Sequence, residues 1–105
     1  MSGNCVGERT QALSLDLTIK KKWFDMIRSG IKKEEYREIK PYWNKRLLSR
    51  VFNVVHFRNG YLKDSPWLTI ELVGIYSGLG IIEWGAPENE PVFILRLGEI
   101  ITQSN

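Results

Sequence analysis

The sequence predicts an α+β domain: a small, mostly antiparallel β-barrel of five to six strands, with two short helices inserted after the first strand region. Several short apolar segments alternate with polar residues or run continuously between turn residues, which is typical of strands. Helical spacing occurs in only two segments, both in the first half of the chain. Two early helices are too few for alternating β-α-β units, so a curled antiparallel sheet is favoured.

Size and composition set the frame for this fold. The chain has 105 residues, enough for one domain, and 43% of them are hydrophobic, enough for a core. No apolar run approaches the roughly 20 residues that cross a bilayer, and the start has no hydrophobic segment of the signal-peptide kind. Cys5 is the one cysteine, which excludes an internal disulfide and suits a reducing cytoplasm. One histidine and one cysteine are too few for the usual zinc ligands.

These observations predict a cytoplasmic protein with a polar, flexible leader over residues 1–10 and a single domain over residues 11–102. We expect no cofactor, no metal site and no membrane contact. Composition does not indicate any particular protein partner.

The first strand and the first helix follow one another closely. Residues 12–19 alternate strictly between apolar and polar, which predicts a half-buried strand. A helix is expected over residues 20–29, with Thr18 as its cap and Gly30 at the position of a C-terminal glycine. The apolar residues at helical spacing are Ile19, Trp23, Met26 and Ile27.

Residues 32–38, Lys-Lys-Glu-Glu-Tyr-Arg-Glu, leave two interpretations open. Propensity slightly favours an exposed helix with charge pairs one turn apart. Against this, Gly30 has just ended one helix and Pro41 begins another. The alternative is a strand with Ile31, Lys33, Glu35 and Arg37 on one face.

The remainder of the chain predicts one more helix and the other strands. The helix covers residues 41–50, with Trp43, Leu47 and Val51 facing inward. Strands are expected over residues 52–58, 67–76 and 92–101.

Turn residues separate these strands. Asn59-Gly60 and the stretch from Lys63 to Pro66 are turn signals between the strands expected over residues 52–58 and 67–76. Residues 77–91 contain three glycines and two prolines, which predicts a long loop with one short strand at residues 81–84.

Charge is segregated along the chain. Residues 20–50 hold eleven of the fifteen Lys and Arg but four of the twelve Asp and Glu, which gives this stretch +7 and the rest −4. Such segregation favours a polyanionic partner, most simply nucleic acid or a nucleotide phosphate. The alternative is a solvated basic face without a partner.

Lys32, Glu35 and Arg37 are the first candidate site residues. A carboxylate between two cations can bind phosphate, read a base edge or move protons in hydrolysis. The alternative, which the charge pattern alone favours, is a surface salt-bridge cluster of little energetic value.

A second candidate group surrounds the predicted hairpin turn. Arg58 and Lys63 suit phosphate contacts, and Tyr61 can stack on a base. Together with Lys40 they would form the approach surface of a ligand cleft. An ordinary hairpin with exposed polar ends explains Arg58, Tyr61 and Lys63 equally well.

The stretch Gly-Ile-Lys-Lys-Glu-Glu-Tyr-Arg at residues 30–37 resembles the G-x-K-x-x-E-x-R motif of the ASCH (activating-signal-cointegrator homology) family. The motif positions match at Gly30, Lys32, Glu35 and Arg37. The motif follows a strand and a helix, as in that family, and the resemblance covers roughly residues 12–101.

This resemblance implies a PUA-like β-barrel in which the segment after Lys32 is a strand. It also implies that Lys32, Glu35 and Arg37 line a cleft beside the barrel that binds RNA or nucleotides. Some family members resemble hydrolases, one branch deacetylating N4-acetylcytidine and another described as a ribonuclease. The deacetylating branch uses a lysine, a threonine and a glutamate. Lys32 matches that lysine, but Glu35 stands where the threonine is expected.

Three functional hypotheses follow. The first is an RNA- or nucleotide-binding domain with a basic cleft. The second is a hydrolase in which Lys32 acts as base and Glu35 as proton shuttle. The third is a protein-interaction module with an apolar surface around Trp67 and Trp84. The first two need a turn or bulge after Gly30, because a regular strand sends Lys32 to the face opposite Glu35.

Overall fold

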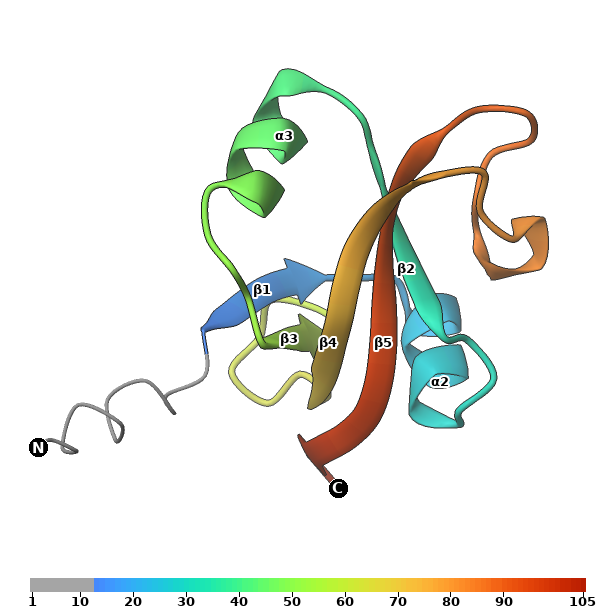
Figure 1. The fold of residues 1–105 in the computed structure, drawn as a ribbon. Coiled ribbons are helices and arrows are strands. Elements are labelled where there is room, and N and C mark those ends of the chain that lie inside the picture. The colour runs from blue at the N-terminus through green and yellow to red at the C-terminus, as the bar shows by residue number, and fades with distance from the viewer. Residues whose placement is uncertain (1–12) are drawn as a thin grey trace, which may run out of the picture.

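The computed structural model describes residues 13–105, which form five strands, two α-helices and one 3-10 helix (Figure 1). The expected leader, with Cys5, lies outside the described residues. The elements in chain order are β1 (Ser14–Thr18), α2 (Lys21–Arg28), β2 (Glu34–Glu38), α3 (Pro41–Leu48), β3 (Val54–Arg58), β4 (Trp67–Gly78), η1 (Ile82–Trp84) and β5 (Val92–Gln103).

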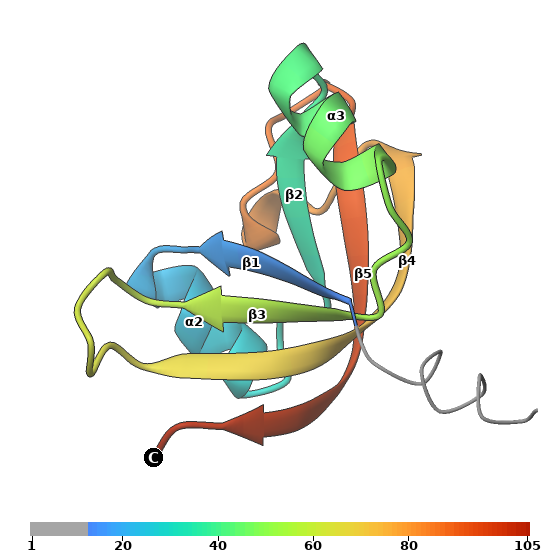
Figure 2. The same ribbon diagram turned by 90° about the vertical axis from the view of Figure 1, so that its left-hand side faces the viewer.

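All five strands belong to one curled sheet with the order β1-β3-β4-β5-β2. β1 and β3 are parallel, and every other pair is antiparallel. β4 and β5 are 12 residues long, and their pairing shifts register three times between Thr69 and Gly74. Such irregularities bend the strands, so the sheet curls into a half-barrel (Figures 1 and 2). The predicted α+β class and mostly antiparallel sheet are confirmed, with five strands.

The order of the strands has one consequence for the site. β1 and β2 are consecutive in the chain, yet they are the two edges of the sheet. α2 connects these two strands, and α3 connects β2 to β3. The two helices lie on opposite sides of the molecule (Figures 1 and 2). Each edge strand has one side that no other strand of the sheet covers.

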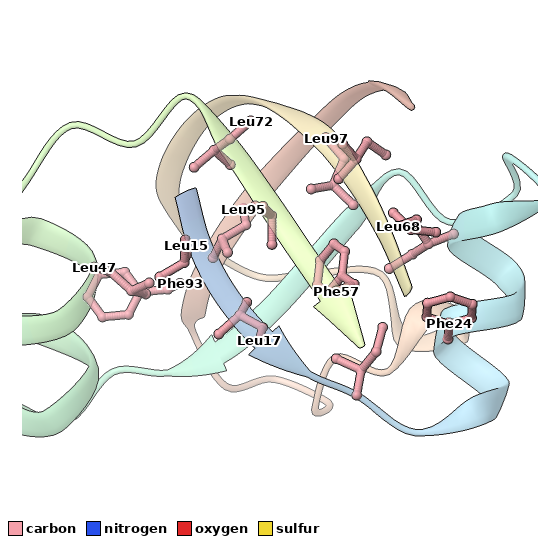
Figure 3. Close-up of a cluster of buried hydrophobic side chains, with 14 residues drawn as sticks. Leu15, Leu17, Phe24, Leu47, Phe57, Leu68, Leu72, Phe93, Leu95 and Leu97 are labelled. Atoms are coloured by element: carbon pink, nitrogen blue, oxygen red, sulfur yellow. The ribbon is translucent and has the colours of Figure 1, made fainter. Parts of the chain in front are cut away.

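The core fills the inner side of the curl (Figure 3). It joins all the major elements except β2: Leu15 and Leu17 from β1, Phe24 and Ile27 from α2, Leu47 from α3, Val55 and Phe57 from β3, Leu68, Ile70 and Leu72 from β4, and Phe93, Leu95 and Leu97 from β5. A second, smaller cluster packs Tyr36 of β2 against Ala86 and Val92. The alternation predicted for the first strand is confirmed by the burial of Leu15 and Leu17.

Residues 34–38 form a strand, so the helix that propensity favours for this segment is wrong. β2 pairs along its whole length with β5, Tyr36 opposite Ile94. That ladder and the burial of Tyr36 outweigh the few tenths of a kcal/mol that charge pairs contribute to a short exposed helix.

Three local predictions are also wrong. Thr18 lies inside β1 and does not cap the helix, whose N-cap is Lys20 without a side-chain hydrogen bond. Residues 82–84 are a 3-10 helix instead of a strand, and Gly85 ends it with φ +105°. Val51 is 81% exposed, because α3 ends at Leu48 and the chain has left the helix before reaching it.

Gly30 forms the turn between α2 and β2. Its φ is +88°, a region that side chains with a Cβ adopt at a cost. Gly30 N–H donates to Ile27 O (3.1 Å), and Ile31 N–H donates to Met26 O (3.0 Å), which is the Schellman pattern. Lys32 N–H also donates to Met26 O (3.0 Å), so the chain has reversed before β2 begins.

No helix of the described residues is long and apolar enough to span a membrane.

The turn at Gly30 gives a first prediction. Gly30→Ala is expected to lower the free energy of unfolding in urea by about 1–2 kcal/mol, because a Cβ in this left-handed conformation is strained. Nothing lies within 4 Å of the added Cβ, so the loss comes from the backbone alone. Gly30→Asn is the control and should lose less, since Asn tolerates this region. Equal losses in the two variants would contradict the assignment.

Candidate functional site

The three charged residues of the motif converge. Lys32 Nζ lies 3.3 Å from Glu35 Oε1, and Arg37 Nη1 contacts Glu35 Oε2. The side chains of Lys32 and Glu35 are 1% and 6% exposed, and that of Arg37 is 18% exposed. Because the Schellman turn places Lys32 before β2, it is not bound to the strand's alternation and can meet Glu35. The meeting of Lys32 with Glu35 requires the chain to turn after Gly30, and the structure has that turn.

The Lys32 side chain is buried, with 1% of its surface exposed. Its Nζ donates to the carbonyl oxygen of Trp84 (2.5 Å) and lies 4.7 Å from the ring centroid of Tyr36 and 5.3 Å from that of Trp23. The carbonyl and the two ring faces all favour a cation. Lys32 therefore stabilises the Glu35 carboxylate without itself lining the cleft.

Tyr36 binds the loop between β4 and β5 that supplies the Trp84 carbonyl. Its hydroxyl donates to Glu34 Oε1 (2.7 Å) and accepts from the backbone N–H of Ile81 (3.0 Å), the residue before η1. The loop is thereby held against β2, with the Trp84 carbonyl at Lys32. Burial raises the pKa of the Tyr36 phenol, so its hydroxyl keeps its proton and its role as donor.

Burial lowers the pKa of the Lys32 ammonium below its usual 10.5, because the charged form loses water. The neighbouring Glu35 carboxylate opposes this effect and favours the ammonium form, while Arg37 adds to the lowering. The net direction is downward, so part of the cost of burying this charge is not recovered by its partners.

A cleft of about 540 Å³ lies between the two edge strands. β1 forms one wall, and Glu35 and Arg37 of β2 form the other. Trp23 of α2 and Lys20 before it line one end, Trp43 and Arg46 of α3 the other, and Tyr61 reaches in from the β3–β4 loop. The cleft is the unclosed seam of the half-barrel.

Two arginine guanidinium groups lie over the ring of Trp43. The Arg37 guanidinium lies 5.2 Å from the centroid of the Trp43 ring, and that of Arg46 lies 5.9 Å from it. Arg37 Nη1 also donates to Tyr36 O (3.0 Å), while its buried Nε has no hydrogen-bond partner within the described residues. Arg46 Nη2 donates to the backbone oxygen of Asp16 (2.7 Å), which holds α3 against the open edge of β1.

The second candidate group does not gather in this cleft. Tyr61 lines it and is 88% exposed. Arg58 instead donates to Leu62 O (2.7 Å) and so stabilises its own loop. Lys40 pairs with Glu38 (2.9 Å), and Lys63 is exposed; neither lines the cleft. The structure brings Glu35, Arg37 and Tyr61 together, with Lys32 behind them.

Sequence reasoning missed Trp23, Trp43 and Arg46 as site residues. Trp43 is predicted as a core residue from its helical spacing, and both tryptophans do pack against the core. Each is only partly buried, however, and presents its remaining surface to the cleft. The available signal is the spacing of Trp43 and Arg46, which are three residues apart and so adjacent on one helix face.

Within residues 13–105, no three His, Cys, Asp or Glu side chains gather as they would around a metal ion. Comparison of the chain with models of protein families, with curated proteins and with solved structures found no match.

Glu35→Gln tests the energetic importance of the ion pairs. The substitution keeps the shape but leaves the buried Lys32 ammonium without its counter-charge, so the free energy of unfolding should fall by about 3–5 kcal/mol at pH 7. Glu38→Gln, on the same strand, is the control. Its pair with Lys40 is solvent-exposed, so it should cost about 1 kcal/mol or less. A loss in Glu35→Gln as small as in the control would contradict a buried pair.

The pKa of Lys32 gives a pH-dependent prediction, measured as the difference in unfolding free energy between wild type and Lys32→Met. Between the lowered folded pKa and the unfolded value of 10.5, the unfolded wild type holds more protons than the folded one. The difference should therefore change in favour of the wild type as pH rises through this window, and stay flat below it. A change in favour of Lys32→Met would mean that the folded pKa is raised.

Proposed function

We propose that this chain is a PUA-like ASCH domain that binds RNA or a nucleotide in the cleft between β1 and β2. The observation that carries the proposal is the pairing of cations with exposed aromatic surface in one hollow, centred on Trp43 with Arg37 and Arg46 at its ring. The curled antiparallel sheet and the strand after Lys32 agree with the resemblance at residues 30–37.

Phosphate recognition is assigned to Arg37, Arg46 and Lys20. A guanidinium presents its donors as a planar fork that matches phosphate oxygens. Within residues 13–105, neither Arg46 nor Lys20 forms an ion pair with a carboxylate, so their charges are available to a ligand. Glu35 does not oppose an anion strongly, because Lys32 and Arg37 already contact it from both sides.

Base recognition is assigned to the aromatic residues and Glu35. Trp23, Trp43 and Tyr61 line the cleft, and aromatic side chains are the groups on which unpaired bases stack. A carboxylate oxygen of Glu35 at the cleft wall can accept a hydrogen bond from an amino group of the base or from a ribose hydroxyl. Tyr61 is largely exposed and would become ordered on binding.

Binding is the function that the geometry supports better than hydrolysis. The hydrolase hypothesis requires Lys32 to reach the substrate, but its Nζ is enclosed by Trp84 O, Glu35 and two rings and does not line the cleft. Trp67 and Trp84 do not favour the protein-interaction hypothesis either. Both are partly buried, and Trp67 stacks on His56 at 5.5 Å between ring centroids.

Calorimetric titration with the four ribonucleoside 5′-monophosphates at low ionic strength tests the proposal. At least one should bind, and Arg46→Ala should weaken that binding about tenfold, because a charge-assisted hydrogen bond to phosphate contributes about 1.5–3 kcal/mol. Lys33→Ala is the matched control. It removes one exposed positive charge from the motif stretch, and Lys33 lines a different hollow. If neither a monophosphate nor a short single-stranded RNA binds, or if both variants bind alike, the proposal fails.

A further inference from the structure

We infer that the cleft continues into a second binding hollow along β1 and α3, so that its ligand is a single-stranded oligonucleotide, not an isolated nucleotide. This rests on the proposed function and specifies its ligand. The second hollow has a volume of about 530 Å³ and lies between the first half of β1, α3 and the segment that follows α3. The residues that matter in it are Asp16, Tyr42, Lys45, Arg46, Arg50 and Phe52.

Arg46 stands at the junction of the two hollows. Arg46 and Asp16 line both of them. The Arg46 guanidinium is fixed by the Asp16 backbone oxygen (2.7 Å) and the Tyr42 hydroxyl (3.3 Å), both uncharged. Its positive charge therefore remains available where a phosphate joining two nucleotides would lie.

The second hollow holds a cluster of unpaired cations. In the described part of the chain, Lys21 pairs with Asp25 and Lys40 with Glu38, whereas Lys45, Arg46 and Arg50 form no ion pair. Asp16 is the one acid among the residues lining this hollow, and it accepts a hydrogen bond from Ser14 Oγ (3.1 Å). The excess positive charge of residues 20–50 is thus presented, in part, on one side of α3.

Each hollow also has its own aromatic surface. Tyr42 and Trp43 are consecutive and pack edge to face, 4.9 Å between centroids, yet Tyr42 lines the second hollow and Trp43 the first. Phe52 is a second aromatic side chain that lines this hollow. Cations along the backbone path with aromatic rings for the bases are the arrangement by which proteins bind single strands without strong sequence preference.

The sizes of the two hollows agree with a repeating ligand. Their volumes, about 540 and 530 Å³, both fall within the roughly 300–1,000 Å³ of small-molecule sites. Two adjoining hollows of similar size, sharing an arginine and each carrying an aromatic ring, match two neighbouring nucleotides. An acidic peptide would use the cations but leave the aromatic rings without stacking partners, so we favour the nucleic acid.

The test compares adenosine and uridine 5′-monophosphates with oligoadenylates and oligouridylates of two and four nucleotides, by calorimetry at fixed salt. The oligonucleotides should bind wild type at least about tenfold more tightly than the monophosphate. In Lys45→Ala/Arg50→Ala the ratio of oligonucleotide to monophosphate affinity should fall towards one. The slope of log affinity against log salt for the tetranucleotide should decrease in magnitude by roughly 1.4, for two lost phosphate contacts on a single strand.

Lys33→Ala/Arg96→Ala is the matched control, since it removes the same charge from residues that line neither hollow; it should keep the wild-type ratio. Thermal unfolding midpoints of both double variants verify that they fold. The inference is overturned if oligonucleotides bind no better than monophosphates, if both double variants lower the ratio equally, or if an oligoglutamate peptide binds as tightly as the tetranucleotide. Monophosphate binding without a gain in the oligonucleotide leaves the proposed function standing; absence of all binding removes both.

Discussion

The ion pair between Lys32 and Glu35 is the interaction on which the site depends. A lysine ammonium that is removed from water is stable only where partners offset the loss of hydration. Here the partners come from separate parts of the chain: Glu35 and Tyr36 from β2, Trp23 from α2 and the Trp84 carbonyl from η1. One ammonium group therefore contacts α2, β2 and η1 at the same time. Arg37 contacts the second carboxylate oxygen of Glu35, so the position of Arg37 in the cleft wall also depends on this ion pair.

The curl of the sheet supplies the other half of the arrangement. The bends in β4 and β5 bring β1 and β2, the two edges, to face one another across the cleft. In a closed barrel these edges would pair and leave no space. Here side chains occupy the gap instead. Arg46 of α3, for example, donates a hydrogen bond to the backbone oxygen of Asp16 in β1. The open seam is thus lined by cations and by aromatic rings, and Glu35, paired with Lys32 and Arg37, lies in its β2 wall.

The sequence predicts most of the fold because local signals and tertiary contacts agree there. The alternation that buries Leu15 and Leu17 and the glycine at residue 30 are such signals. At residues 34–38 they conflict: charge spacing favours a helix, and only pairing with β5, far along the chain, makes a strand.

The convergence of Lys32 with Glu35 could be stated from the motif, given a turn after Gly30. The Trp84 carbonyl could not, since any residue supplies a carbonyl and this one is 52 positions away. The role of Trp23 and Trp43 in the cleft could not be predicted either, because helical spacing does not show that a tryptophan packed against the core also lines a cleft.

The indole N–H signals of the tryptophans in a two-dimensional ¹H–¹⁵N NMR spectrum report most directly on whether the buried ion pair organises a nucleotide-binding cleft. On addition of ribonucleoside monophosphates, the signals of Trp23 and Trp43 should shift, while that of Trp67, outside the cleft, should stay in place. In Lys32→Met the shifts should be strongly reduced although Lys32 does not line the cleft, because Glu35 and Arg37 lose their support. Shifts at Trp67 alone, or undiminished shifts at Trp23 and Trp43 in Lys32→Met, would contradict this account.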